Sequence, residues 1–145
     1  MNLYTIGFSK KSAKQFFELL TNNGVKRLVD IRLNNKSQLA GFTKQDDLKY
    51  FLKAIGNIEY VYMPIFAPTE ELLKGYQQKK VNWDMYEKEY LDILKKRDVL
   101  KNMDFSVFDS ACLLCSEDSS EQCHRRLAAE YIAKHNNKVK VVHLK

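Results

Sequence analysis

The chain has 145 residues, 45% of them hydrophobic and 29% charged, which is the balance of an ordinary globular protein. Its length predicts a single α/β domain over residues 1–145, and no apolar run approaches the length of a membrane span. The net charge of +6 favours anionic partners such as phosphates, nucleotides or nucleic acid, although a merely basic surface explains it equally well.

The chain start and the cysteine count both predict a cytoplasmic protein. The first residues lack the basic start and long apolar stretch of a signal peptide. The chain has three cysteines, an odd number, and it is large enough to fold without stabilising disulfide bonds. We therefore expect free thiols and a reducing compartment.

The first half of the chain predicts two strand–helix units. Residues 3–6 form a short apolar strand, and Ser12 with Gln15 makes a capping box for a helix that residues 22–24 end. Residues 25–31 form a second strand, after which Thr43 is expected to cap a helix that Gly56 ends. The expected apolar helix faces are Ala13, Phe16, Phe17 and Leu20, and then Leu48, Phe51, Leu52 and Ile55.

The second half continues the alternation. Residues 58–63 form a strand rich in β-formers, Thr69 opens one helix, and Asn82 caps a longer one. In that longer helix, the spacing of Trp83, Tyr86, Tyr90 and Leu94 indicates a core face. Residues 103–109 read as a loop, 111–115 as a buried strand and 138–144 as a closing strand. Asp118 with Glu121, or Ser119 with Gln122, is expected to cap the last helix.

This order predicts an α/β fold with a mainly parallel sheet of about five strands and helices on both faces. Pockets in such sheets lie beyond the carboxyl ends of the strands. Gly7 and Ser9, Asp30 and Arg32, and Cys115 and Glu117 each follow their own strand. We predict that these groups meet in one crevice.

The stretch 115–126 carries the densest chemistry. Cys115 and Glu117 stand where a strand ends, and Cys123, His124 and Arg125 stand at the start of the following helix. These residue types suit zinc, but their spacing matches no zinc-finger pattern, so we expect no metal.

The thiols have a second reading as nucleophiles. A thiol near a helix N-terminus and beside arginine has a lowered pKa. The opposing interpretation is packing, where free cysteines usually end up. We assign Cys112 to packing, favour packing for Cys123, and leave Cys115 open between the two readings.

The same segments predict an anion site. Arg32 and Arg125 can bind phosphate or carboxylate oxygens, with Gly7, Ser9 and Cys123 beside them. Glu117, Asp30 or His124 would then transfer protons. The alternative is that Asp30 and Glu117 pair with the arginines and act only structurally.

Four segments resemble a known family: Tyr4–Ser9, Val29–Arg32, Leu113–Glu117 and Cys123–Arg125. They are similar to the YeaO-like domain-of-unknown-function family numbered 488, a group of small prokaryotic proteins. The resemblance implies an α/β fold and a site built from these segments, and it supplies no reaction. The family usually has histidine where this chain has Phe8, so a chemical role of that histidine would be lost or altered here.

The resulting hypothesis is a cytoplasmic protein that binds or transforms a phosphate-bearing small molecule such as a nucleotide, with Cys115, Glu117, His124 and Asp30 as candidate catalytic groups. One alternative is a nucleic-acid-binding module, which the +6 charge favours. Another is an adaptor whose Cys-His-Arg motif only fixes a helix to the sheet.

Overall fold

The computed structural model, which describes residues 1–35, 41–117 and 120–145, contains a five-stranded parallel sheet. The strands are β1 (Asn2–Gly7), β2 (Arg27–Asp30), β3 (Glu59–Tyr62), β4 (Ala111–Cys115) and β5 (Lys140–His143). Their order across the sheet is β3-β2-β4-β1-β5. The predicted α/β class, strand number and parallel direction are confirmed.

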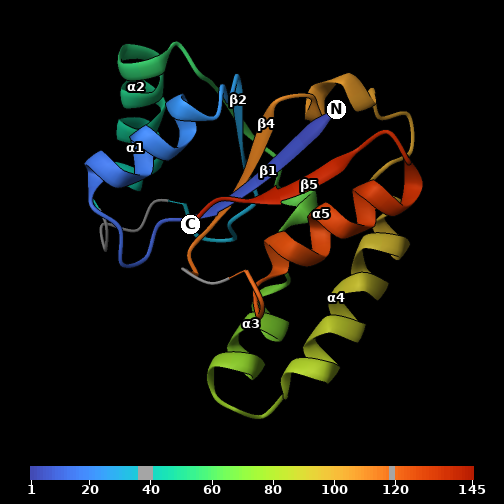
Figure 1. Cartoon of the computed structure of the whole chain (residues 1–145). Helices are drawn as coiled ribbons and strands as arrows, with labels where there is room; N and C mark the ends of the chain where they lie inside the picture. The colour runs from blue at the N-terminus through green and yellow to red at the C-terminus, as the bar shows by residue number, and fades with distance from the viewer. Residues whose placement is uncertain (36–40, 118–119) are drawn as a thin grey trace.

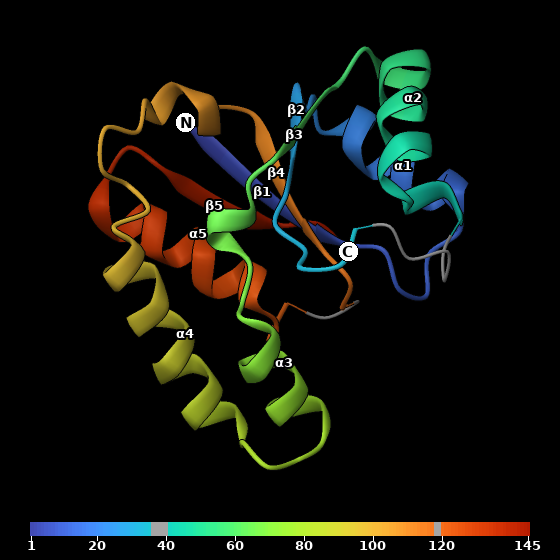
Figure 2. The same ribbon diagram turned by 180° about the vertical axis from the view of Figure 1, so that it is seen from behind.

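Helices cover both faces of the sheet. α1 (Ala13–Asn22) and α2 (Gln45–Gly56) lie on one side, while α3 (Glu70–Gln77), α4 (Trp83–Arg97) and α5 (His124–His135) lie on the other (Figures 1 and 2). α5 packs on β1, β4 and β5, and α4 packs outside it against α3 and α5. None of the helices in the described part of the chain is long and apolar enough to cross a membrane.

The central strand β4 is buried on both faces. Ala111 and Leu113 belong to the core beneath α4 and α5, while Cys112 and Leu114 belong to the core beneath α1 and α2. This alternation follows from the two-residue period of a strand. It places Cys115 on the α5 side and Cys112 on the opposite side.

Three predicted helix starts are confirmed. Ser12 and Gln15 form the full capping box of α1, because each side chain accepts a hydrogen bond from the other residue's backbone. Thr69 caps α3 and Asn82 caps α4 through their side-chain oxygens. These caps depend on chemistry within one turn, which a sequence reading can follow.

Other boundary predictions are wrong. Thr43 lies in a 3-10 turn, Gly41–Thr43, and Lys44 precedes α2 without a side-chain cap. Ile55 is 53% exposed and lies outside the expected core. α5 begins only at His124, with Cys123 before it; Asp118 and Ser119, the expected caps, lie outside the described residues. The predicted loop at 103–109 contains the 3-10 turn Phe105–Phe108.

The strand order brings the candidate segments together. β4 lies between β1 and β2, with Gly7 opposite Cys115 and Asp30 opposite Leu114. Beyond the strands, the backbone N–H of Ser9 donates to the carbonyl of Ser116 at 3.0 Å. The three strand ends therefore lie side by side.

Candidate functional site

A pocket of about 340 Å³ opens at the carboxyl ends of β1, β2 and β4. Its lining includes six of the predicted site residues, namely Ser9, Arg32, Cys115, Glu117, Cys123 and His124. The α3–α4 hairpin supplies the facing wall through Tyr76, Trp83 and Tyr86. The expected crevice between Arg32 and Glu117 is therefore present, whereas Gly7, Asp30 and Arg125 do not line it.

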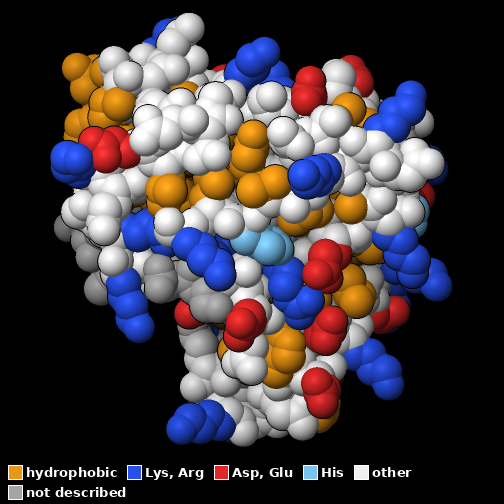
Figure 3. All heavy atoms as spheres, viewed as in Figure 1, with side chains coloured by type: hydrophobic (Ala, Val, Ile, Leu, Met, Phe, Trp, Pro, Cys, Tyr) orange, Lys and Arg blue, Asp and Glu red, His pale blue; other side chains and the backbone are white. Residues whose placement is uncertain are grey.

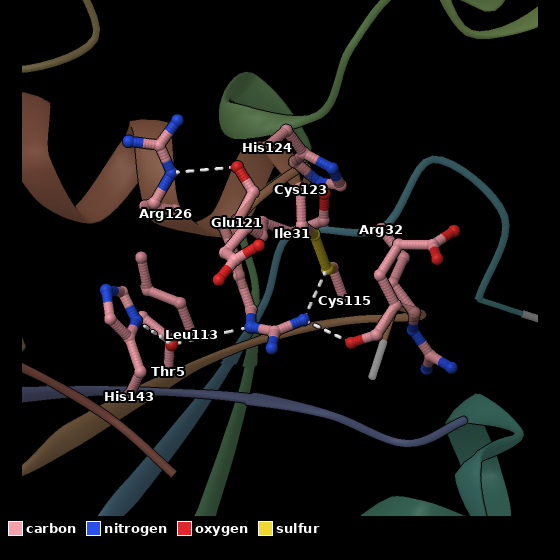
Figure 4. The surroundings of a disulfide bond; sticks show 12 residues. Thr5, Ile31, Arg32, Leu113, Cys115, Glu121, Cys123, His124, Arg126 and His143 are labelled. Carbon is pink, nitrogen blue, oxygen red and sulfur yellow. Dashed lines mark hydrogen bonds between the residues drawn. A yellow bond between two sulfur atoms is a disulfide. The ribbon is translucent and has the colours of Figure 1, made fainter. Parts of the chain in front are cut away.

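Two cysteines form the floor of this pocket. Cys115 ends β4 and is 1% exposed, and Cys123 precedes α5 and is 3% exposed. Their sulfur atoms are bonded as a disulfide (Figure 4). The expectation of free thiols is wrong for this pair, because the sequence does not reveal that the chain returns to place the start of α5 against the end of β4. Cys112 is free and fully buried, which agrees with its assignment to packing.

His124 adjoins the disulfide and is held in one orientation. Its Nε2 lies 2.9 Å from the carbonyl oxygen of Ile31. A carbonyl only accepts hydrogen bonds, so Nε2 carries the ring proton. Burial lowers the pKa of His124 to about 4, which leaves the ring neutral near pH 7 with a lone pair on Nδ1. One ring nitrogen and the two sulfur atoms lie within 4.8 Å of one another.

Arg125 lies behind the pocket and joins three segments. Its side chain is 1% exposed, and its Nη1 donates to the sulfur of Cys115 at 3.3 Å and to the carbonyl of Glu117. Its Nε donates to the hydroxyl of Thr5 at 3.4 Å, and that hydroxyl lies 2.6 Å from Nδ1 of His143. Arg125 therefore fixes α5 to the ends of β1 and β4.

Gly7 makes this arrangement possible. A Cβ atom at this position would lie 1.6 Å from the carbonyl oxygen of Glu117 and 2.7 Å from Nη1 of Arg125. Only a residue without a side chain allows the backbone after β4 to approach β1 so closely. Gly7 thus shapes the site from behind.

Asp30 and Arg32 form a buried ion pair. Nε and Nη2 of Arg32 donate to the two carboxylate oxygens of Asp30 at 2.8 and 2.9 Å. Tyr60 donates to the same carboxylate at 2.6 Å, and Nη2 of Arg32 also donates to the carbonyl of Thr43. The guanidinium carbon lies 5.6 Å from the ring centre of Phe8. Asp30 thus has the structural pairing that was one of its two sequence readings.

Glu117 differs from Asp30 in being exposed at the pocket. Within the described parts of the chain its carboxylate has neither a hydrogen bond nor an ion pair. Burial raises the pKa of Tyr86, and the nearby Tyr76 and Glu117 add to this effect. Glu117 is therefore a carboxylate that a pocket ligand can reach.

The aromatic wall is the part of the site that sequence reasoning missed. Trp83 and Tyr86 stack with ring centres 5.2 Å apart, and Tyr76 lies 5.0 Å from Tyr86. The hydroxyl of Tyr76 donates to Gln122 at 3.1 Å. Helical spacing assigned Trp83 and Tyr86 to the core, and Tyr86 does belong to it at 3% exposure. The spacing did not show that both residues also line the pocket, and Tyr76 was not among the candidate site residues. The available signal was aromatic residues on both sides of the short segment between α3 and α4.

Charged side chains of both signs lie on the face shown in Figure 3. Basic side chains are scattered over this face, and acidic side chains gather over α4 and α5. A larger hollow of about 680 Å³ lies between α4 and α5 and shares no lining residue with the strand-end pocket. Its lining mixes lysines and glutamates with Leu91, Leu127 and Tyr131.

Comparison with known proteins identifies one family. Residues 12–132 match the family model described as Domain of unknown function DUF488. No curated protein and no solved structure matches the chain. The matched range includes most of the pocket lining, from Arg32 to His124.

Proposed function

The chain belongs to the DUF488 family, and we propose that its strand-end pocket binds a small molecule combining a planar ring with an anionic group, such as a nucleotide, in the cytoplasm. The volume of about 340 Å³ lies within the range of small-ligand sites. Glu117 is the proposed proton-transfer group, because its carboxylate is exposed at the pocket.

The observation that carries this proposal is the meeting of two recognition surfaces in one pocket. The first is the aromatic wall of Tyr76, Trp83 and Tyr86, since a flat ring gains stacking energy against such side chains. The second is the start of α5, where the positive end of the helix dipole favours negative charge. A ligand with a ring at one end and a phosphate at the other fits both.

The arginines have different roles in this proposal. Arg32 lines the pocket, and its Nη1 donates to none of the described residues, so it can donate to a bound anion. Arg125 has its donors directed to Cys115 and Glu117 and acts as a positioning residue. Asp30 likewise holds Arg32 in place.

Ligand binding to the pocket can be measured by tryptophan fluorescence. Trp83 is the single tryptophan of the chain and lines the pocket, so its fluorescence reports on occupancy. We expect adenosine monophosphate to change this fluorescence in a saturable way, with adenosine alone and inorganic phosphate each binding at least about tenfold more weakly, a difference of about 1.4 kcal/mol. Each fragment reaches only one of the two surfaces.

Two tyrosine variants provide the matched comparison. Tyr76→Ala removes part of the wall and is expected to weaken binding about tenfold, in line with the cost of losing one stacked ring. Tyr50→Ala removes a tyrosine that is 69% exposed on α2, and binding is expected to stay unchanged. An absence of any saturable change with nucleoside monophosphates, or equal binding by both variants, would contradict the proposal.

The same titrations separate the two alternatives. A nucleic-acid-binding module predicts affinity for oligonucleotides that falls steeply with salt, by nearly one unit of log–log slope per phosphate contact. An adaptor predicts that no small ligand binds and that substitutions at Cys123, His124 and Arg125 reduce only stability.

A further inference from the structure

The cluster of Cys115, Cys123 and His124 has a capacity that the sequence spacing did not reveal. We propose that these three residues, with the cysteines reduced, bind a zinc ion at the floor of the pocket. The sequence led us to expect no metal, because the cysteine spacing matches no zinc-finger pattern. The fold supplies the missing element by bringing the end of β4 to the start of α5.

The donor set and its dimensions fit this ion. Two thiolates and one imidazole are ordinary zinc ligands, with Zn–S distances of about 2.3 Å and Zn–N distances of about 2.0–2.1 Å. Around a tetrahedral ion such ligand atoms lie about 3.5–3.8 Å apart. The three donor atoms here all lie within 4.8 Å of one another, so side-chain rotations suffice to enclose the ion.

The backbone spacing also leaves room for an ion between the two sulfur atoms. The Cα atoms of Cys115 and Cys123 are 7.6 Å apart. Disulfides usually join residues whose Cα atoms are about 4.4–6.8 Å apart. A zinc ion between two thiolates accommodates the wider spacing.

Neighbouring groups already orient the ligands. The carbonyl of Ile31 accepts from Nε2 of His124, which leaves Nδ1 as the coordinating atom and fixes the ring plane. Arg125 donates to the sulfur of Cys115 at 3.3 Å, an interaction that favours the thiolate. Such supporting hydrogen bonds are typical around protein metal sites.

The disulfide and the metal-bound pair are alternative states of the same sulfur atoms. A dithiol reductant supplies two electrons and two protons, which break the S–S bond and give two thiols. Zinc then displaces both thiol protons to solvent as the two Zn–S bonds form. Three protein ligands leave a fourth position for water or a ligand group, and all three residues line the pocket.

The test uses metal alone, on protein prepared without a histidine tag and kept reduced with a phosphine. Metal-depleted protein is titrated with Zn²⁺ against a chromophoric chelator, and with Co²⁺ as a spectroscopic substitute. We expect one ion per chain and, with Co²⁺, thiolate charge-transfer absorption in the near ultraviolet together with intense visible bands typical of tetrahedral sites. Failure of the reduced wild type to bind stoichiometrically, or a Co²⁺ spectrum without thiolate absorption, overturns the proposal.

Variants locate the site. Loss of a supporting hydrogen bond costs about 10–100-fold in metal affinity, so loss of a ligand in Cys123→Ser or His124→Asn is expected to cost at least about 100-fold. Cys112→Ala changes the buried cysteine on the opposite face of the sheet and should bind like wild type. Equal affinity in all variants means that the ion binds elsewhere and also overturns the proposal. The Trp83 titration is a separate measurement, so failure of the nucleotide proposal leaves this result unaffected.

Discussion

At the scale of single residues, the Asp30–Arg32 pair predicts a large energetic effect. Asp30 is completely buried and Arg32 is 3% exposed, so removing one partner leaves an uncompensated charge in the interior. We expect Asp30→Ala to lower the free energy of unfolding by about 3–5 kcal/mol, measured by urea denaturation. The matched control is Glu18→Ala, which breaks the exposed pair with Lys14 and should change stability little. Equal effects in the two variants would contradict the structural role assigned to Asp30.

Gly7 supports a second prediction at this scale. In Gly7→Ala the new Cβ would meet backbone atoms of Glu117, which cannot rotate away as a side-chain end can. We expect a loss of about 1–3 kcal/mol in unfolding free energy, as for other overpacked sites, and weaker ligand and metal binding because the end of β4 must shift.

Gly41→Ala is the control for this substitution. Among the residues that the structure describes, none would lie within 4 Å of a Cβ at Gly41, and Gly41 is not among the residues with positive φ. Its thermal midpoint is expected to match that of the wild type, while that of Gly7→Ala falls. A normal midpoint in Gly7→Ala would show that the segment after β4 does not hold the position described.

At the scale of elements, two adjacent arginines on α5 test how this helix is attached. Arg125 is buried and connects α5 with β1, β4 and the segment after β4. Arg126 is partly exposed; it pairs with Glu130 on its own helix and more distantly, at 3.9 Å, with Glu87 of α4. Arg125→Met keeps the side-chain length but leaves the carbonyl of Glu117 without this donor, so we expect a loss of about 1–3 kcal/mol, with Arg126→Met nearly neutral.

Hydrogen exchange can locate the effect of these substitutions. Amides of α5 should exchange faster in Arg125→Met than in Arg126→Met, because the first variant loosens the docking of the helix. Uniform changes along the chain in both variants would argue against a specific attachment by Arg125.

Elements were predictable from the sequence where their determinants are local. The run Ala111–Cys115 is apolar throughout because β4 is central and buried on both faces, and its bounds were predicted correctly. The cap at Asn82 likewise lies within one turn of the helix that it starts. The start of α5 was predicted too early, since several polar residues before Cys123 have capping chemistry and only tertiary packing decides between them.

Only part of the candidate site could likewise be predicted from the sequence. The rule that pockets lie beyond parallel strand ends predicted one crevice for Arg32 and Glu117, and both residues line the strand-end pocket. That their strand ends are neighbours depends on the strand order, which the sequence does not reveal. The inward direction of Arg125 depends on which partners lie beneath α5, and one of these partners, Thr5, lies 120 positions away in the chain. The aromatic wall depends on how the α3–α4 hairpin folds over the strand ends, which no local pattern specifies.

At the scale of the whole molecule, the strand order explains how the site is assembled. β4 is inserted between β1 and β2, so the last motif in the chain lies between the two earliest ones. The sheet fixes the strand ends, and residues of the α3–α4 hairpin and the start of α5 complete the lining of the pocket. Contacts distant in sequence thus define the pocket, and it is expected to be lost together with the global fold.

The interior of the molecule also predicts its response to alkaline pH. Burial raises the pKa values of Tyr60, Tyr86, Tyr90 and Cys112 above their ordinary values. The unfolded chain ionises such groups from about pH 9–10 upward, whereas the native state keeps them protonated. The native state then binds more protons than the unfolded state, so the free energy of unfolding falls as the pH rises through this range.

Tyr90 allows this prediction to be tested at one residue. It is fully buried and donates to the carbonyl of Phe66 at 2.6 Å, so Tyr90→Phe is expected to be less stable than wild type at pH 7. In the wild type, ionisation of this hydroxyl in the unfolded chain lowers the free energy of unfolding by up to about 1.4 kcal/mol per pH unit, and the variant lacks this effect. The difference in unfolding free energy between the two proteins should therefore narrow as the pH rises above about 10. Urea denaturation at pH 7 and at pH 10–11 measures this difference, and Tyr50→Phe, at an exposed position, should show the wild-type pH dependence. A difference of constant size would mean that the Tyr90 hydroxyl ionises as readily in the native state as in the unfolded chain, contrary to its burial.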